Sequence, residues 1–331
     1  MTIAVDDRQF AELVEPLRRE LTAHCYRMMG SVQDAEDQVQ ETYLRAWRAF
    51  HDFENRSSIR TWMYRIATNV CLTALDRRER RPMPTGLGQP AANPRGSLDF
   101  RPEIGWLEPM PDAVIWGGAA ADPAAEVVDR ESVRLAFVAA LQHLTPAQRA
   151  TVILRDVLAW QASEVADLLA ISVAAVNSSL QRARAQLAKL DPDGAEDSLD
   201  DELARKFLRD YVAAFENYDV PRIVELLAKD VVWEMPPYLG WYRGPEAIGQ
   251  LIRTHCPAER TGDQVLVPVS ANGQPAFGLY MRQPDGTYSA FQLQVLTLSP
   301  GGVSHVGCFF DTTLFARFGL PDALTGDATG S

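Results

Sequence analysis

The stretch from Leu158 to Lys189 constrains the fold of this chain most strongly, because it reads as two short helices joined at a tight corner. Ser163 and Ser172 are the expected N-caps of the two helices, since a side-chain oxygen at that position accepts an orphan backbone N–H. The corner falls at residues 170–172. Apolar residues at helical spacing predict the buried stripe of the second helix, namely Val176, Leu180, Ala183 and Leu187.

The opposite face of the second helix carries small polar residues, which can approach base edges, and arginines, which can reach phosphates. This is the composition of the recognition helix in a helix-turn-helix. The candidate DNA-contacting residues are Ala174, Asn177, Ser178, Gln181, Arg182 and Arg184. An ordinary helical hairpin with a solvated outer face is the alternative interpretation.

The length of 331 residues suggests two or three domains. We find no run of eighteen apolar residues and no charged-then-apolar leader, so we expect a cytoplasmic protein that does not enter a membrane. The four cysteines are scattered and lack metal-ligand spacing, which predicts reduced core residues, no metal site and no cofactor. They are Cys25, Cys71, Cys256 and Cys308.

The net charge of -12 argues at first against nucleic-acid binding. However, acidic and basic residues are nearly equal in number in residues 1–81 and in the two-helix stretch, and most of the excess acidic residues follow Asp191. Because charge acts locally, the acidic total does not exclude DNA contact, although it predicts weak binding by the isolated chain.

Three helices are expected near the N-terminus, over residues 8–29, from Ser31 onward, and over 59–81. The second helix has acids in its first turn, where they complement the helix dipole. The third combines aromatic residues with arginines, which suits single-stranded DNA because aromatics stack on unpaired bases. Plain core packing is the alternative role for each of these aromatics.

Two motifs carry a resemblance to a known family. The run from Asp34 to Trp47, DAEDQVQETYLRAW, resembles region 2 of the extracytoplasmic-function sigma factors of the sigma-70 family, and residues 61–69 resemble the second half of that domain. Residues 144–149, LTPAQR, followed by the helical corner, resemble sigma region 4. The resemblance implies an alternative sigma factor that binds core RNA polymerase, melts the -10 promoter element and reads the -35 element.

The resemblance also implies roles for individual residues. Candidates for docking on core polymerase are Asp37, Gln40, Glu41 and Arg45, with a solvated helix face as the alternative. Candidates for the -10 element are Phe53, Arg60, Trp62, Arg65 and Asn69. Extruding a base requires a pocket that stacks on it and bonds its edge, and Asn69 offers both a donor and an acceptor. Asn177-Ser178-Ser179 stand where many members carry basic residues, so we expect weak binding by region 4 alone.

Residues 82–124 are rich in Pro and Gly, which predicts an extended linker between the two DNA modules. The aromatic island around Trp106 and Leu107 interrupts that composition. Isolated apolar residues in a linker often dock onto another surface. A similar motif occurs in sigma factors that bear a C-terminal extension, so we expect these two residues to join the linker to that extension.

After residue 203 the pattern changes to two helices followed by strand-like runs, which predicts an α+β cone with an antiparallel sheet. Residues 203–318 resemble the SnoaL-like group of the NTF2-like superfamily. The predicted architecture is therefore multidomain: two all-α sigma domains (8–81 and 125–190), the linker (82–124) and the α+β cone (203–318).

The cone implies a pocket in which an unidentified small ligand is a candidate partner. Its candidate lining residues are Trp233, Met235, Trp241, His305 and Asp311. Cyclases of the superfamily transfer protons with an acid and a histidine, so His305 with Asp311 or Glu234 is a candidate pair. Because strand residues in a cone are mostly core, a regulatory, non-enzymatic domain is the favoured interpretation. A free-standing ligand-sensing regulator and a cyclase-like enzyme are the alternatives.

Overall fold

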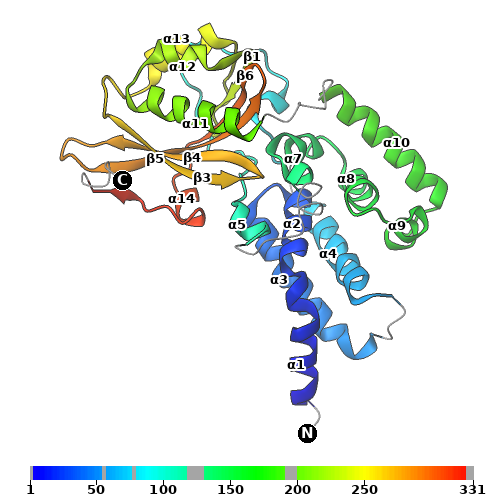
Figure 1. Ribbon diagram of the computed structural model, residues 1–331. Coiled ribbons are helices and arrows are strands. Elements are labelled where there is room, and N and C mark those ends of the chain that lie inside the picture. Colours follow the sequence, from blue (N-terminus) through cyan, green and yellow to red (C-terminus); the bar gives the residue numbers. More distant parts are fainter. Residues whose placement is uncertain (1–2, 54–56, 77–79, 118–129, 191–199, 326–331) are drawn as a thin grey trace. The chain divides into compact units, whose positions relative to one another are not determined.

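The computed structural model describes residues 3–53, 57–76, 80–117, 130–190 and 200–325 of the chain (Figure 1). It divides into two compact units. The first comprises residues 1–81 and 107–194, and the second comprises residues 82–106 and 195–331. The predicted linker is therefore divided between the units, because residues 82–106 belong to the second and the residues from Leu107 onward belong to the first.

The first unit is helical. Its N-terminal part contains α1 (Ile3–Val14), α2 (Arg18–Met29), α3 (Val32–Ala49) and α4 (Ile59–Leu75). The second expected helix, α3, begins at Val32, close to the predicted start at Ser31, and Ser31 caps it by accepting a hydrogen bond from the Asp34 N–H at 3.2 Å. Phe10 of α1 packs edge-on against Trp47 and Phe50, with ring centroids 5.4 and 5.1 Å apart.

Two expected helix bounds in this part are wrong. The helix predicted over residues 8–29 is divided at a 3₁₀ turn, Glu15–Leu17, since Pro16 has no N–H for an α-helical bond. Leu13 of α1 is exposed, although Phe10 and Val14 of the same helix are buried. The third helix ends at Leu75 rather than at residue 81, and residues 77–79 lie outside the described residues.

The rest of the first unit contains α5 (Asp112–Ile115), α7 (Leu135–Leu141), α8 (Pro146–Val152), a π-helical turn (Ile153–Val157), α9 (Ala162–Leu169) and α10 (Val173–Leu190). Thr145 and Gln148 form a reciprocal capping box at the start of α8. Among the described residues, no single helix is long and apolar enough to cross a membrane; the bent pair α9 and α10 meets the test jointly, by length and composition alone.

The second unit is an α+β cone. Its helices are α11 (Asp201–Glu216), α12 (Val220–Glu225), α13 (Pro245–His255) and α14 (Leu314–Arg317). Its strands are β1 (Leu227–Glu234), β2 (Trp241–Arg243), β3 (Gln264–Ala271), β4 (Gln274–Arg282), β5 (Tyr288–Ser299), β6 (Gly302–Phe309) and β7 (Ala323–Leu324).

The strands form one sheet in the order β2-β1-β6-β5-β4-β3, with β7 added to β5. The sheet is mixed rather than antiparallel throughout, because β1 pairs with β6 in parallel, with Trp233 opposite Val306. This correction follows from topology: α11 and α12 precede β1, and the chain returns to the middle of the sheet only after β3, β4 and β5. Sequence patterning identifies strands but not their neighbours.

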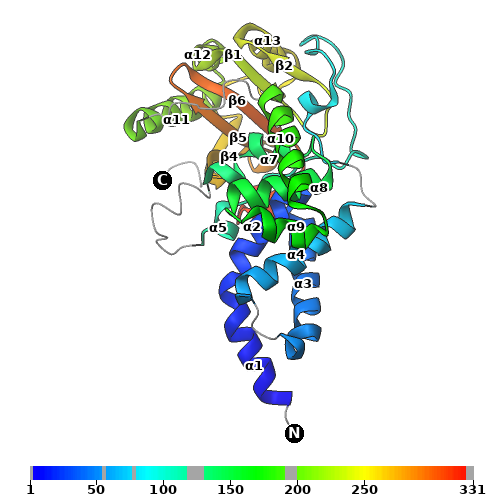
Figure 2. The same ribbon diagram turned by 90° about the vertical axis from the view of Figure 1, so that its right-hand side faces the viewer.

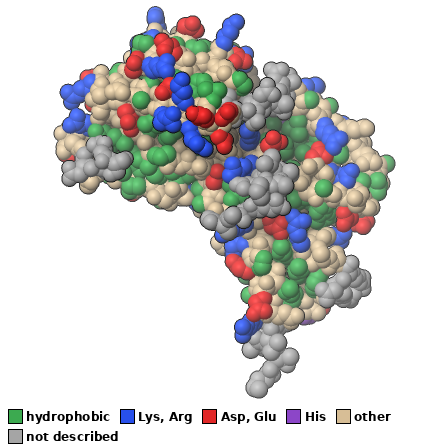
Figure 3. Space-filling model, viewed as in Figure 1, with side chains coloured by type: hydrophobic (Ala, Val, Ile, Leu, Met, Phe, Trp, Pro, Cys, Tyr) green, Lys and Arg blue, Asp and Glu red, His purple; other side chains and the backbone are tan. Residues whose placement is uncertain are grey.

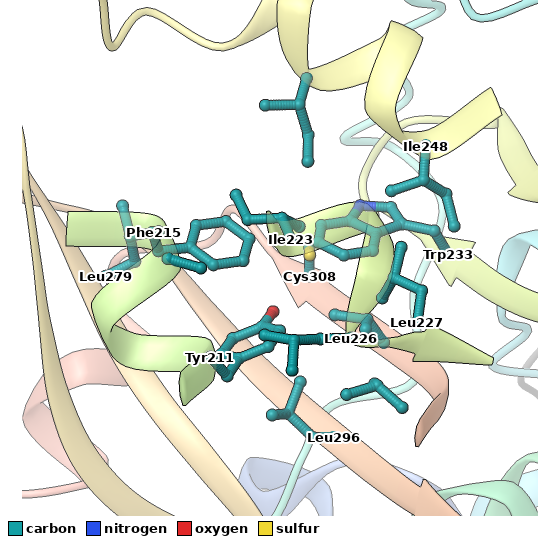
Figure 4. Packing of buried hydrophobic residues seen from close by; sticks show 14 of the residues in the cluster. Tyr211, Phe215, Ile223, Leu226, Leu227, Trp233, Ile248, Leu279, Leu296 and Cys308 are labelled. Atoms are coloured by element: carbon teal, nitrogen blue, oxygen red, sulfur yellow. The ribbon is translucent and has the colours of Figure 1, made fainter. Parts of the chain in front are cut away.

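The core of the cone lies between the sheet and helices α11, α12 and α13 (Figure 4). Tyr211 and Phe215 of α11 point toward Leu279 of β4 and Trp233 of β1. The Tyr211 hydroxyl donates to Gln294 Oε1 at 2.9 Å, which gives the buried phenol its partner. Burial raises the pKa of this hydroxyl, so Tyr211 is a neutral donor in the core.

Candidate nucleic-acid and polymerase interface

The corner between α9 and α10 has helix-turn-helix geometry, with the two helices bent by 100° (Figure 1). Ala170 ends α9 in the left-handed conformation, with φ 54°. Ser172 Oγ accepts the Ala175 N–H at 3.2 Å, as predicted for the cap of the second helix. The cap of the first helix is Gln161, which forms a capping box with Glu164, and the prediction of Ser163 is wrong.

The outer face of α10 is solvent-exposed at Ala174, Asn177, Gln181, Arg182 and Arg184, and half-buried at Ser178. The predicted inner stripe is buried at Val176, Leu180 and Ala183, while Leu187 is only half-buried. The residues proposed to read bases thus lie on one accessible face. Figure 3 shows acidic and basic side chains interspersed over the viewed surface.

Arg184 differs from the other candidates on this face because it is already paired. Its Nε and Nη2 lie 3.0 and 2.5 Å from the carboxylate oxygens of Asp156 in the π-helical turn. Hydrogen bonding to Asp156 raises the pKa of Arg184. A phosphate contact by Arg184 requires this ion pair to open, whereas Arg182, two residues earlier on α10, is exposed.

The -10 candidates surround one end of α4. Phe53 and Trp62 lie with ring centroids 4.9 Å apart, and Phe53 also stacks with Phe50 at 6.4 Å. Phe53 and Trp62 are half-buried, and Asn69 is exposed two turns further along α4. Trp62 and Asn69 of α4, with Phe53 from the preceding loop, thus offer aromatic faces and an amide, which are the groups that an unstacked base requires.

The two arginines of this set are held differently. Arg60 is 2.6 Å from Glu20 and covers the Tyr64 ring at 5.2 Å. The hydrogen bond to Glu20 raises the pKa of Arg60, so its charge is tied to α2. Arg65 is half-buried, and its Nε is buried without a hydrogen-bond partner in the described residues. Because this donor is buried, an acceptor from DNA can reach it only if the neighbouring side chains move.

The polymerase candidates lie along one side of α3. Asp37, Gln40 and Arg45 are exposed and Glu41 is half-buried, with Arg45 Nε 2.6 Å from Glu41. Leu44, which sequence reasoning does not single out, is 50% exposed beside them. An exposed leucine within a charged helical face is typical of a protein-docking surface.

The two helical modules of the first unit pack together through buried guanidinium groups. Arg149 of α8 donates through Nε to the Leu141 carbonyl at 2.9 Å and through Nη1 to the Met28 carbonyl at the end of α2. Arg27 of α2 donates to the Ser132 carbonyl at 3.1 Å and to its hydroxyl at 2.6 Å. Burial lowers the pKa of Arg149 to about 10, against an opposing contribution from Cys71.

These buried arginines are functional candidates that sequence reasoning does not identify. Only Arg149 could have been identified from the sequence, because it is the last residue of the LTPAQR motif. It lies on the buried side of its helix. Tyr64 adds an aromatic contact, with its ring centroid 6.3 Å from that of Trp160. The -10 helix is thus in direct contact with the region that precedes the helix-turn-helix.

Trp106 and Leu107 are both buried, but they belong to different units. The Trp106 Nε1 donates to the Arg101 carbonyl at 2.9 Å within the second unit. Leu107 packs over Gly30 of the first unit, where it would lie 2.9 Å from an added Cβ. The expectation that both residues join the linker to the extension therefore needs correction for Leu107, whose contact is with the α2–α3 turn.

The linker contact with the cone is made further upstream, by residues 82–101 (Figure 2, cyan, beside β2 and α13). Trp241 of β2 donates from Nε1 to the Gln89 carbonyl at 2.8 Å and accepts the Ala92 N–H at 2.8 Å. The Leu239 N–H donates to the Asp99 carbonyl at 2.9 Å. Main-chain bonds of this kind impose little sequence signature, so composition alone could not locate them.

Of the predicted pocket residues, Trp233 and Met235 lie in the packed core of the cone. The Trp233 ring stacks on that of Phe215 with centroids 6.5 Å apart, so Trp233 packs as a core aromatic and does not face an open pocket. Asp311 is exposed, and its Oδ1 accepts from the Thr313 N–H and hydroxyl in a turn. It therefore does not pair with His305.

His305 pairs instead with Glu234, with Nε2 2.8 Å from Oε2. The other carboxylate oxygen, Oε1, accepts the Thr85 N–H of the linker at 2.7 Å. Burial opposes ionisation of Glu234, but the bonds to His305 and Thr85 outweigh it and lower its pKa. The acid–base pair that sequence analysis proposed thus exists, and a linker amide covers it. No cluster of three metal-ligating side chains occurs in the described part of the chain.

Comparisons with protein families agree with these modules. The Sigma-70 region 2 profile matches residues 13–81. The Sigma-70 region 4 profile matches residues 134–187, and that of the SnoaL-like domain matches residues 208–299.

Individual relatives extend over nearly the whole chain. The chain is 56% identical to the ECF RNA polymerase sigma factor SigG of Mycobacterium tuberculosis over 323 residues. This alignment covers 96% of this chain and 86% of SigG. The chain is also 33% identical over 227 residues to the ECF RNA polymerase sigma factor SigJ of the same organism. This alignment covers 66% of this chain and 62% of SigJ. The crystal structure of SigJ has the same fold, with a TM-score of 0.63 at 24% identity over 94% of this chain and 100% of that one.

Proposed function

Because the chain belongs to the ECF family of RNA polymerase sigma factors, we propose that α10 reads the -35 element and α4 the -10 element while α3 docks on core polymerase. As an alternative sigma factor with a SnoaL-like extension, it acts in transcription initiation. The proposal rests chiefly on the exposed polar face of α10 beyond a 100° corner. Core polymerase and promoter DNA are the partners, which assigns the chain to the cytoplasm.

Run-off transcription with core polymerase tests these assignments. Asn69→Ala should reduce promoter opening, because it removes the amide that bonds an extruded base. Gln181→Ala should weaken binding to the -35 element by about 1–3 kcal/mol while leaving -10 binding unchanged. Leu44→Asp should lower affinity for core polymerase. Normal output from all three variants would contradict the residue assignments, and specific duplex binding without polymerase would favour a free-standing regulator.

For the second unit we propose a regulatory and non-enzymatic role. Both carboxylate oxygens of Glu234 are engaged, one by His305 and one by the Thr85 N–H. Glu234 is only 3% exposed, so it offers no open position to a substrate. A small ligand that binds the Glu234 carboxylate must therefore displace the Thr85 N–H or His305.

Comparison of the intact chain with one truncated before residue 200 tests the regulatory role. Promoter output in the purified system should differ between the two, because the truncation removes the surface to which residues 82–101 bind. Equal output on several promoters would argue against regulation by the second unit. A catalytic activity that is lost in His305→Ala while promoter output is unchanged would instead favour the enzyme alternative.

A further inference from the structure

Residues 107–117 lie against the region 2 helices, although they belong to the predicted linker. Leu107 is fully buried and Ile115 of α5 is 6% exposed. Figures 1 and 2 both show α5 beside α2, and Arg19 of α2 donates to the Trp116 carbonyl at 3.3 Å. We name residues 107–117 the docked stretch. It contributes side chains to the surface of region 2.

Glu108 fixes the docked stretch to the turn between α2 and α3. Its backbone N–H donates to the Gly30 carbonyl at 3.0 Å, and its carbonyl accepts the Tyr26 hydroxyl at 2.7 Å. Its Oε2 accepts the N–H of Val32, the first residue of α3, at 3.1 Å. Gly30 has a φ of 72°, and an added Cβ there would lie 2.9 Å from Leu107 Cδ1. The turn therefore fits this segment closely and holds it beside both helices.

A hollow of about 350 Å³ lies where α5 meets α2 and α3. Its lining residues are Arg18, Arg19 and Thr22 of α2, Glu36, Val39 and Gln40 of α3, and Val114 of α5. Val39 and Thr22 are buried, and the Thr22 hydroxyl already donates to the Arg18 carbonyl at 2.8 Å, so the floor is mainly apolar. Gln40 and the two arginines are exposed and form a polar rim. An engineered protein cavity of about 150 Å³ holds benzene, so this hollow has room for a bulky apolar side chain.

The hollow is continuous with the α3 face that is proposed to dock on core polymerase. Glu36, Gln40 and Leu44 follow one another at intervals of four residues, which places them in one row along α3. Gln40 lines the hollow and is itself a polymerase candidate, and Leu44 is 50% exposed one turn further along. A partner that covers Leu44 along this row therefore reaches the rim of the hollow.

The two arginines at the rim are held differently. Arg18 donates to the two carboxylate oxygens of Glu15 at 2.7 and 2.9 Å and covers the Tyr43 ring at 4.7 Å. Arg19 donates to the Trp116 carbonyl at 3.3 Å, but no carboxylate of the described residues lies within 4 Å of it. An exposed guanidinium without a carboxylate partner, beside an apolar hollow, suits an acidic group on a binding partner.

We propose that the hollow receives a bulky apolar side chain of core RNA polymerase, and that Arg19 pairs with a carboxylate next to that side chain. The docked stretch of the linker then forms one wall of the polymerase interface, through Val114. An anchor side chain in a pocket with a polar rim is the arrangement that dominates binding energy in protein interfaces. This inference rests on the proposed function of α3 and adds α2 and α5 to its surface.

The affinity of the full-length chain for purified core polymerase tests the hollow. Val114→Trp fills the hollow and should weaken binding about tenfold, because the partner side chain is excluded. Ala113→Trp is the matched control, since Ala113 is the exposed neighbour on α5, does not line the hollow, and should leave affinity unchanged. Equal affinities of Val114→Trp and Ala113→Trp would overturn the proposal.

Charge reversal at the rim provides an independent variant that leaves the hollow open. Arg19→Glu should weaken core binding about fivefold at low salt and less at high salt, because an attractive charge becomes a repulsive one. Arg19→Lys keeps the charge and should restore most of the affinity. Arg205→Glu makes the same change in net charge at an exposed arginine of α11 that also has no ion pair in the described residues, and it is the control. Equal affinities of Arg19→Glu and Arg205→Glu would reject the pairing of Arg19.

A photo-crosslinking amino acid in place of Val114 identifies the occupant of the hollow directly. With purified core polymerase, an adduct with one of its subunits is expected. An adduct with a second copy of this chain would identify a self-association surface instead, and that result, or no adduct with the core enzyme, would overturn the assignment.

Leu44→Asp separates failure of the inference from failure of the proposed function. If Leu44→Asp lowers core affinity while Val114→Trp and Arg19→Glu do not, α3 docks as proposed and the hollow is not part of the interface. If none of the three variants lowers core affinity, the assignment of α3 fails and the inference fails with it.

Discussion

The two units bury ionised side chains of opposite sign, and each uses its buried charge to hold a segment distant in sequence. In the first unit, the Arg149 guanidinium binds the Leu141 and Met28 carbonyls and so joins α8 to α2. In the second, Glu234 binds His305 and the Thr85 N–H and so joins β1 to the linker. Their partners differ in kind, since Arg149 has neutral carbonyls while Glu234 has a titratable imidazole.

Because the partners differ, the two contacts should differ in how they can be broken. A guanidinium remains charged across the physiological range, so the Arg149 contact breaks only by separating the modules. A carboxylate bound to histidine and a single amide can exchange that amide for another donor. We infer that the first contact is a structural lock and the second an exchangeable one.

Removing the Arg149 charge should have the largest effect. Arg149→Met should lower the free energy of unfolding of the first unit by about 3 kcal/mol, because two buried carbonyls lose a charged donor. Urea denaturation measures this change. Arg182→Met on the exposed face of α10 is the control and should stay within about 0.5 kcal/mol of the wild type. Equal effects of the two substitutions would refute the lock.

The corresponding change in the second unit should be smaller. Glu234→Ala should cost about 2 kcal/mol, because it leaves the Thr85 N–H without its acceptor. Amide exchange at Thr85 should accelerate, since this proton loses its protection. Glu234→Gln keeps an acceptor for the Thr85 N–H, so its stability should lie between that of the wild type and that of Glu234→Ala. Unaltered exchange at Thr85 in the alanine variant would show that other contacts hold the linker.

The two units should lose stability at different pH values as the solution is acidified. Burial, with the Arg27 charge, lowers the pKa of His24 to about 3. Since this lies below the usual 6.5, the unfolded state binds more protons, and the first unit should lose about 1.4 kcal/mol per pH unit as pH falls from 6.5 toward 3.

Glu234 contributes to the second unit in a different window. Its folded pKa is below 4.5, so its stabilisation is fully present above pH 4.5 and is lost only as pH falls through the lowered value. Urea denaturation at pH 7, 6 and 5 should therefore show the first unit losing stability at pH values where the contribution of Glu234 is still complete. His24→Gln should reduce that slope and leave the part expected from His143, whose pKa is also lowered by burial. An unchanged slope in this variant would assign it to other groups.

Exposed charges on α10 should show the smallest effects. Arg184→Ala should cost no more than about 1 kcal/mol, because its ion pair with Asp156 is partly exposed. Arg182→Ala should leave stability unchanged but reduce the salt dependence of DNA binding by about one charge. A salt titration of promoter affinity for both variants tests this contrast, and equal slopes would assign Arg184 a phosphate contact as well.

Local patterns were sufficient to predict much of this architecture. The spacing of Val176, Leu180 and Ala183 predicted the buried side of α10, and Ser172 was correctly predicted as its cap. These features depend on neighbours within one or two helical turns, which a single sequence contains. The same kind of reasoning overlooked Pro16 and so joined two helices into one.

The composition of residues 82–124 predicted a chain without its own core, and that much needs only local information. Where the segment docks depends on partners far away in sequence: Trp241 for Gln89, Glu234 for Thr85, and Gly30 for Glu108. In each of these contacts the linker contributes a backbone group, which carries almost no side-chain signature, so the partners could not be identified in advance.

The sequence by itself determined the helical and strand segments, the family and the face of α10 that is proposed to meet DNA. Tertiary structure alone decided the parallel pairing of β1 with β6, the buried arginines between the helical modules and the choice of Glu234 rather than Asp311 as the partner of His305. The physical reason is that periodicity and capping are properties of adjacent residues, whereas burial of a charge depends on which distant groups surround it.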